Sequence, residues 1–217
     1  MADLRQQIPD EVIKLGSVAA VAADPALVVT FSPNSPLPVG NNTIGTVNIA
    51  SSALPSTYSA TISGLALATT ATDIFTIIGS ATKTIRITKI AINGIQTTAG
   101  QVGVVLLRRS TANAGGTFTA QTAVPYDSTN LAATAVVSAY TANPTTVGTL
   151  VGNFYSQRVF MPGAATASDA QGLSVAFGDV NQQYVTLRGI AQGLSVNLAG
   201  VSVVGGSINI TIEWEES

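Results

Sequence analysis

Apolar and polar residues alternate along most of the chain beyond about residue 60, and this alternation predicts β-strands. The pattern is clearest near the last residues, where four large apolar side chains would share one face of a strand: Ile208, Ile210, Ile212 and Trp214. The residues between them are polar and would form the opposite face: Asn209, Thr211, Glu213 and Glu215. We therefore expect a strand that covers a core, with Trp214 at least partly buried.

Several segments share this strand pattern: 74–78, 84–93, 102–109, 134–140, 155–161, 173–177, 184–188, 194–198 and 207–215. Turns rich in Gly, Asn and Pro separate them, such as Asn93-Gly94. Within 84–93 the apolar positions change phase between Ile87 and Ile90, which predicts one extra residue, a β-bulge. Short strands joined by such turns predict an all-β fold, an antiparallel β-sandwich of the jelly-roll type.

The first residues carry a helix signal. Pro9 suits a first helical turn, and the carboxylates of Asp10 and Glu11 would lie near the positive end of the helix dipole. One apolar stripe would be formed by Ile8, Val12, Ile13 and Leu15, before Gly16 ends the helix. The segment is either a frayed terminus or a docking peptide that becomes ordered on a partner.

Residues 17–59 contain one charged residue, Asp24. Pro33, Pro36 and Pro38 follow Phe31 and enforce an extended path. We therefore predict an extended N-terminal arm over residues 1–59, used for docking and oligomerisation, and a β-sandwich domain over residues 60–217. The candidate partner-binding residues of the arm are Ile8, Val12, Ile13, Phe31, Pro33, Pro36, Pro38, Ile44, Val47 and Ile49.

The composition removes most catalytic chemistry, because the chain has no His and no Cys and only 9% charged residues. The formal net charge of −2 offers no basic field for nucleic acid. The longest dense apolar run, 102–107, is far shorter than the roughly 20 residues of a membrane span. The polar N-terminus predicts no secretory signal. We expect a protein that joins surfaces, with no enzymatic activity, no cofactor, no nucleic acid and no membrane as partner.

Few side chains remain for site chemistry. Asp127 and Asp169 would have to meet in space to form a glycosidase pair, and sugar hydrolases also need aromatic platforms, which are scarce here. Asp169 and Asp179 could supply oxygen ligands to Ca²⁺, but no clustered calcium loop supports this, and turn residues are the expected role. Arg108 and Arg109 are expected at a solvated strand end; the alternative is an ion pair across a subunit boundary.

Three stretches resemble segments of tailed-bacteriophage virion proteins: 32–49, 72–88 and 107–116. Residues 140–144 and 212–216 fit the same style. The resemblance implies a β-sandwich structural protein of the particle, either a capsid decoration (cement) protein or a head or tail fibre subunit. It also implies a homotrimer that binds the major capsid protein or other virion proteins and is located in the virion, assembled in the host cytoplasm. It carries no catalytic residues across to this chain.

Capsid decoration is therefore the first hypothesis for function, with the arm docking on the shell or on neighbouring copies. The second is a fibre subunit that recognises a host glycan through sandwich loops, with Tyr126, Asp127, Asn130 and Asn143 as candidate residues. An enzyme is the third, and it would need a carboxylate pair that the sequence does not reveal.

Overall fold

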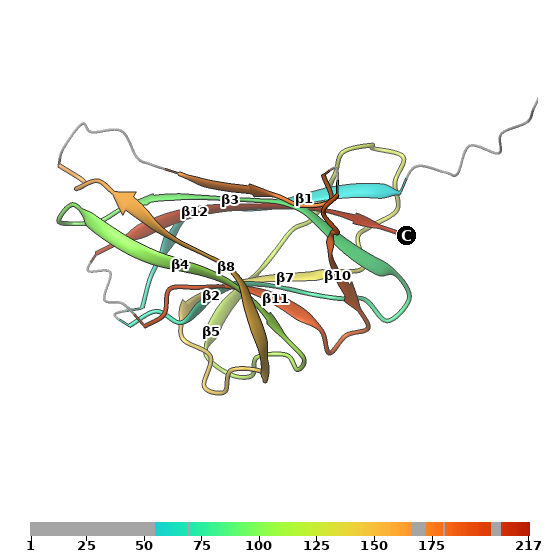
Figure 1. Cartoon of the computed structure of the whole chain (residues 1–217), viewed down its shortest axis with the longest axis horizontal. Helices are drawn as coiled ribbons and strands as arrows, with labels where there is room; N and C mark the ends of the chain where they lie inside the picture. The colour runs from blue at the N-terminus through green and yellow to red at the C-terminus, as the bar shows by residue number, and fades with distance from the viewer. Residues whose placement is uncertain (1–54, 69, 166–171, 180, 201–204) are drawn as a thin grey trace, which may run out of the picture. The chain divides into compact units, whose positions relative to one another are not determined.

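The computed structural model describes residues 55–217, except 69, 166–171, 180 and 201–204. All of these residues belong to one compact unit, Ser51–Ser217. The described residues form two antiparallel sheets that face each other and contain no helix, so the predicted β-sandwich is confirmed (Figure 1). The expected arm, with its helix and all ten of its candidate partner-binding residues, lies outside the described residues.

The first sheet has the strand order β10-β3-β12-β1-β6, and β9 also pairs with β3. The bounds are β1 Ser56–Ala66, β3 Thr84–Ile95, β6 Val124–Pro125, β9 Leu173–Ala176, β10 Val185–Arg188 and β12 Ser207–Glu216. On its outer face, Arg86 pairs with Glu215 and Lys89 with Glu213, at 3.4 Å and 3.2 Å. These partly buried pairs on the sheet surface link neighbouring strands, and each adds little to stability.

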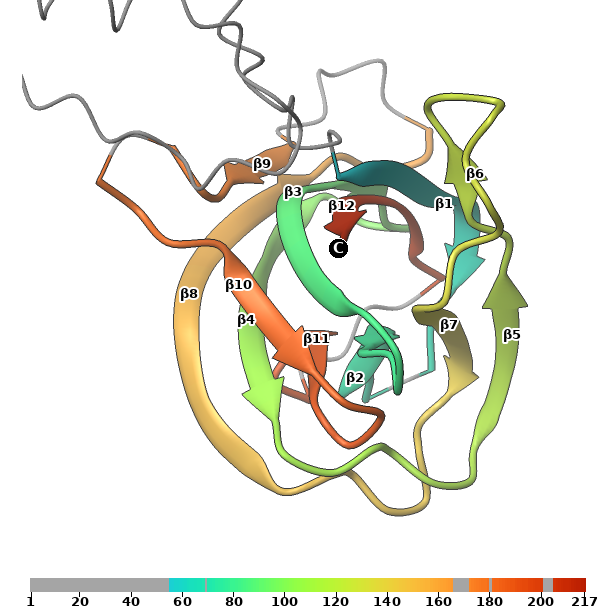
Figure 2. The same ribbon diagram turned by 90° about the vertical axis from the view of Figure 1, so that its right-hand side faces the viewer.

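The second sheet has the order β5-β7-β2-β11-β4-β8. Its strands are β2 Asp73–Ile78, β4 Gly100–Arg109, β5 Thr117–Gln121, β7 Val136–Ala142, β8 Leu150–Met161 and β11 Gly193–Asn197. Figure 2 shows β8 and β10 on one side of the sandwich and β5 and β6 on the opposite side. Both β8 and β5 are therefore edge strands of this sheet.

The chain passes between the sheets in jelly-roll order. One sheet contains β1, β12, β3 and β10 as neighbours, and the other contains β2, β11, β4 and β8. Successive strands of this set alternate between the sheets except from β4 to β8, which are neighbours in one sheet, and this is the order of a jelly roll. The segment that contains β5, β6 and β7 is inserted between β4 and β8 and widens both sheets on the side away from β8.

The core forms where the apolar faces of the two sheets meet. Every second residue of β12 is buried, as the alternation predicts, and Trp214 is 0% exposed. The bulge predicted in β3 is also present: Glu213 pairs with Lys89 and Trp214 pairs with Ile87, so Thr88 is the extra residue. This residue shifts the phase, so that Ile85 and Ile87 before it and Ile90 and Ile92 after it all lie in the core.

The boundary predicted after residue 59 falls inside a strand. β1 begins at Ser56 and pairs with β12 from Glu216 onward. Tyr58 is buried, and its ring stacks on Trp214 at a centroid distance of 5.7 Å. The sandwich therefore begins at or before Ser56, because residues 56–59 already supply core and sheet pairing. The composition break that suggested residue 60 reflects a strand of small polar residues, not the end of an arm.

Candidate interaction surface

Strand β8 exposes an unusual number of apolar side chains. Leu150, Val151 and Phe154 are 53%, 61% and 40% exposed, and Val147 just before the strand is 44% exposed. We call these four residues the β8 ridge. Single exposed apolar residues are common on protein surfaces, but a group on one strand marks a contact site.

Two bulges shape the ridge. Leu106 of β4 pairs with Tyr155 and Leu107 with Asn153, which leaves Phe154 as an extra residue on β8. The next irregularity leaves Val151 unpaired in the same way. Each bulged residue therefore carries an exposed apolar side chain. Bulges redirect side chains, so the ridge is a consequence of this local backbone geometry.

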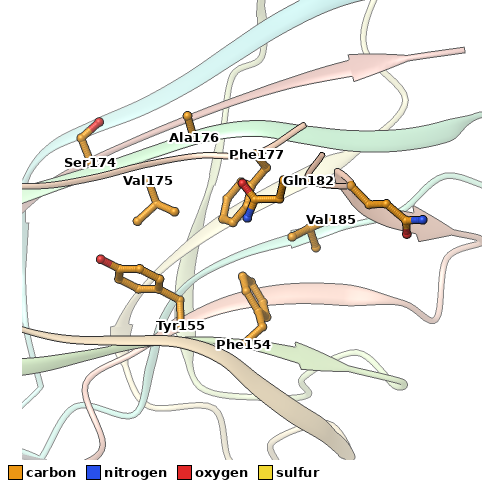
Figure 3. Close-up of a pocket in the computed structure, with 9 residues that line it drawn as sticks. Phe154, Tyr155, Ser174, Val175, Ala176, Phe177, Gln182 and Val185 are labelled. Atoms are coloured by element: carbon orange, nitrogen blue, oxygen red, sulfur yellow. The ribbon is translucent and has the colours of Figure 1, made fainter. Parts of the chain in front are cut away.

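The bulge at Phe154 also creates a groove. Neighbouring residues of a regular strand point to opposite faces, yet Phe154 and Tyr155 both line the groove (Figure 3). The groove has a volume of about 510 Å³ and lies between β8 of one sheet and β9 and β10 of the other. We call this side, between the free edges of the two sheets, the open side of the sandwich.

The chemistry of the groove is neutral. Three rings line it, from Phe154, Tyr155 and Phe177, and the Phe154 and Phe177 rings meet edge to face at 5.8 Å. Its polar side chains are Ser174, Gln182 and Gln183, and no charged residue is among the described residues that line it. This lining can hold an apolar or uncharged polar group, and it offers no carboxylate or imidazole for acid–base catalysis.

Free strand edges border the groove on both sides. Within the described part of the chain, β8 pairs only with β4, and β9 and β10 pair only with β3. The outward backbone N–H and C=O groups of these edges can therefore pair with another extended chain. The β8 edge has no Pro and one charged residue, Arg158, so the usual devices that block edge pairing are mostly missing apart from the bulges.

The glycan candidates from the sequence separate into two places. Tyr126, Asp127 and Asn130 lie together on the segment after β6, where Tyr126 is 62% exposed. Asp127 accepts hydrogen bonds from the backbone N–H and the hydroxyl of Thr129, both at 2.8 Å, and these bonds lower its pKa. This is a turn-stabilising role.

Asn143 lies elsewhere and acts as a tether. Its amide nitrogen donates to the Thr70 carbonyl at 2.8 Å, and its oxygen accepts from the Thr72 backbone N–H at 2.9 Å. The side chain is therefore already committed to holding the segment before β2, and the structure does not place it with the other three candidates.

Arg109 differs from the expectation of a solvated strand end. Its side chain is 7% exposed and donates two hydrogen bonds to Asp73, which is fully buried: Nε to Oδ2 at 2.5 Å and Nη2 to Oδ1 at 2.7 Å. Asn113 and Asn197 donate to the same carboxylate at 2.9 Å and 2.6 Å. The ion pair is formed within one chain and joins β2, β4 and β11, so Arg109 is a structural residue.

A second buried carboxylate lies at the end of β12. Glu216 accepts hydrogen bonds from the Trp214 indole nitrogen and from the backbone N–H groups of Thr134 and Ala135, all at 3.0 Å. Burial alone raises the pKa of this carboxyl, but these donors outweigh it and lower the pKa. The pKa of Asp73 is lowered in the same way: burial raises it, and the bonds from Arg109, Asn197 and Asn113 outweigh that effect.

These two shifts predict how stability depends on pH. Because both folded-state pKa values lie below the ordinary 3.8 of Asp73 and 4.5 of Glu216, the folded protein binds protons less readily than the unfolded chain. The stabilisation is complete above these values and is lost as pH falls through and below them. The chain has no His, so we expect the thermal midpoint to stay constant from about pH 8 to about pH 5.5 and to fall below about pH 4.5. Differential scanning calorimetry across this range tests it, and a large change between pH 8 and 5.5 would contradict it.

Metal and catalytic carboxylate sites gain no support. Among the residues that the structure describes, no three His, Cys, Asp or Glu side chains lie close enough to hold a metal ion. Asp169 lies outside the described residues, so its pairing with Asp127 or Asp179 stays an untested alternative. The described residues also include no helix long and apolar enough to span a membrane.

Comparisons with known proteins do not assign the chain to a family. No protein-family model, no curated protein and no solved structure matches the chain. Function therefore has to be argued from the surface of the molecule, because a jelly-roll fold alone hosts many functions.

Proposed function

We propose that this chain is a non-enzymatic structural protein of a virus particle and that it decorates the capsid, binding the shell and stabilising it. The observation that carries the proposal is the surface on β8, where an exposed apolar ridge adjoins a neutral groove between two free strand edges. Such a surface suits lasting contact with another protein and lacks the groups that turn over a substrate.

The composition supports the same proposal. Charged residues are 9% of the chain, well below the roughly 25% of an ordinary soluble domain, so little repulsion keeps copies apart. Jelly rolls are recurrent in viral capsid proteins, and the sequence segments resemble those of phage virion proteins. Under this proposal the partners are the major capsid protein and further copies of the chain, most simply in a homotrimer.

The mechanism would be additive burial. Each copy contributes a modest apolar contact, and symmetry repeats that contact over the particle. The arm over residues 1–54 and the β8 surface would act together, the first reaching a neighbour and the second receiving one. No step of this mechanism needs a cofactor or a metal ion.

A fibre subunit that recognises a host glycan is the second candidate. It is favoured by one observation, the exposed Tyr126 ring on a segment that also carries Asp127 and Asn130. An exposed aromatic ring can stack on a sugar, and neighbouring polar side chains can bind its hydroxyl groups. The groove aromatics on β8 could serve the same purpose.

Immunogold electron microscopy of particles from the source tests the proposal. Antibody to this chain is expected to label the whole head surface, and antibody preabsorbed with the purified chain serves as the control. Label confined to the tail or to sparse fibres would favour the glycan candidate and lead to glycan-array binding. Label on no particle would overturn the virion proposal.

A further inference from the structure

We infer that the groove on the open side of the sandwich, together with the free edge of β8, is an acceptor site for an extended segment of a second copy of this chain, and that the segment is residues 27–31. This inference rests on the proposed function in one respect, since that function requires copies to be joined. It goes further by naming both the donor and the acceptor.

The shape of the acceptor calls for an extended peptide. The groove is bounded by backbone edges without strand partners among the described residues, on β8 at one side and on β9 and β10 at the other. A strand added to the β8 edge would satisfy the free N–H and C=O groups and place every second side chain in the groove. A globular face could not enter between the two sheets in this way.

The lining of the acceptor specifies the chemistry of the donor. Phe154, Phe177 and Val175 offer apolar contact, and none of the described lining residues is charged. The donor should therefore be uncharged, with apolar side chains at alternate positions. A donor carboxylate or ammonium group would be desolvated there without an opposite charge.

Outside the described residues, the chain contains a segment of this kind with large apolar side chains. Residues 26–31 read Ala-Leu-Val-Val-Thr-Phe, without charge, Gly or Pro. In an extended conformation, Leu27, Val29 and Phe31 would lie on one face, spaced for alternate insertion into a groove. Pro25 and Pro33 bound the segment and would end its pairing on each side.

The stiffness of the tether favours a second copy over the same copy. Residues 32–55 connect the donor to β1 and number 24, which reach up to about 80 Å when extended. This reach permits docking on a neighbouring copy, and it also covers the roughly 15 Å from β1 across β12 and β3 to β10 in the same copy. Pro33, Pro36 and Pro38 directly follow the donor and predict a stiff, extended spacer that resists folding back.

Disulfide cross-linking between two full-length copies, each with one introduced cysteine, tests the inference. The protein has no Cys of its own that could interfere. One tagged variant carries the donor change Leu27→Cys, Val29→Cys or Phe31→Cys, and a co-expressed variant with a different tag carries Phe154→Cys. Oxidation is expected to give an interchain disulfide for at least one donor position. The matched controls are Thr30→Cys, on the opposite face of the donor, and Val136→Cys, an exposed position on β7.

Two outcomes would overturn the inference. In the first, a variant carries the donor and the acceptor cysteine in the same chain and forms only an intrachain disulfide. This result would show that the arm folds back on its own copy. Absence of disulfides above the two controls would show that residues 27–31 do not dock here. Neither outcome depends on particle labelling, so failure of this inference is distinguishable from failure of the proposed function.

A charge substitution gives a second, independent readout. Phe154→Glu would place an unpaired carboxylate in the occupied groove and is expected to raise the dissociation constant between copies at least about tenfold. Val136→Glu, at a similarly exposed apolar position on β7, is expected to change it little. Sedimentation velocity measures both, with circular dichroism to confirm that each variant is folded. Equal association of the two variants would contradict the inference.

Discussion

Replacing Asp73 with Asn is expected to lower the free energy of unfolding by about 3–5 kcal/mol. The substitution leaves the Arg109 guanidinium, 7% exposed, without a counter-ion. It also turns one acceptor oxygen into a donor that would face Arg109, Asn113 or Asn197, all of which donate to the present carboxylate. A buried charge that has lost its partner is far more unfavourable than the loss of one hydrogen bond.

Urea unfolding followed by the fluorescence of the single Trp measures this effect. Asp127→Asn is the matched control, because Asp127 is a fully exposed carboxyl that stabilises a local turn, and the unfolding midpoint should change little. If Asp73→Asn and Asp127→Asn had the same small effect, the Asp73–Arg109 pair would not be a structural centre of the sandwich.

A double-mutant cycle separates the ion pair from its surroundings. Arg109→Met removes the cation and leaves Asp73 with its two Asn donors, so it should also destabilise strongly. Together with Asp73→Asn it should be less harmful than the sum of the two single changes, because no buried charge is then left alone. Strict additivity would indicate that the two side chains act independently.

The sequence predicted the parts of the fold whose signal is local. The apolar face of β12 and the bulge in β3 follow from alternation along a single segment. One face of each strand is buried in the core and the other is exposed to solvent. The jelly-roll order was expected only as a class, because pairing between distant strands such as β1 and β12 is not encoded in any one segment.

Other parts could not be predicted for physical reasons. Residues 56–66 consist largely of small polar residues and Ala, and the strand forms there because β12 offers a pairing edge. The predicted strand 155–161 is only the second part of β8, which begins at Leu150; two bulges interrupt the regular alternation over residues 150–154. The burial of Arg109 depends on Asp73, a residue on a strand that is not its sequence neighbour.

The candidate site shows the same division. The sequence predicted contact residues in the arm, where prolines and the absence of charge are visible, and glycan-binding candidates in the loops, but none on β8. The β8 ridge was missed because exposed apolar residues on an edge strand have the same pattern as buried ones. Only the exposure of Val151 and Phe154 at bulged positions separates a contact surface from a core strand.

Deleting residues 1–54 is expected to leave a folded sandwich, whereas deleting residues 1–59 should unfold it or cost several kcal/mol. The shorter deletion stops before β1 and leaves every described strand intact. The longer one removes Ser56–Ser59, which pair with Glu213–Glu216 of β12. It also removes the Tyr58 ring, stacked on Trp214, and the Tyr58 hydroxyl, which donates to the Leu131 carbonyl at 2.8 Å.

Tyr58→Ala in the full-length chain is the matched control for this pair of deletions, and it should lower the free energy of unfolding by about 3–5 kcal/mol, as large-to-small changes of buried rings do. Urea unfolding of all three proteins, followed by Trp214 fluorescence, places them on one scale. If the deletion of residues 1–54 were as damaging as that of 1–59, residues before β1 would belong to the core of the sandwich. The arm could then not be free to reach a second copy. This comparison therefore also tests whether the donor segment, residues 27–31, can leave its own sandwich without unfolding it.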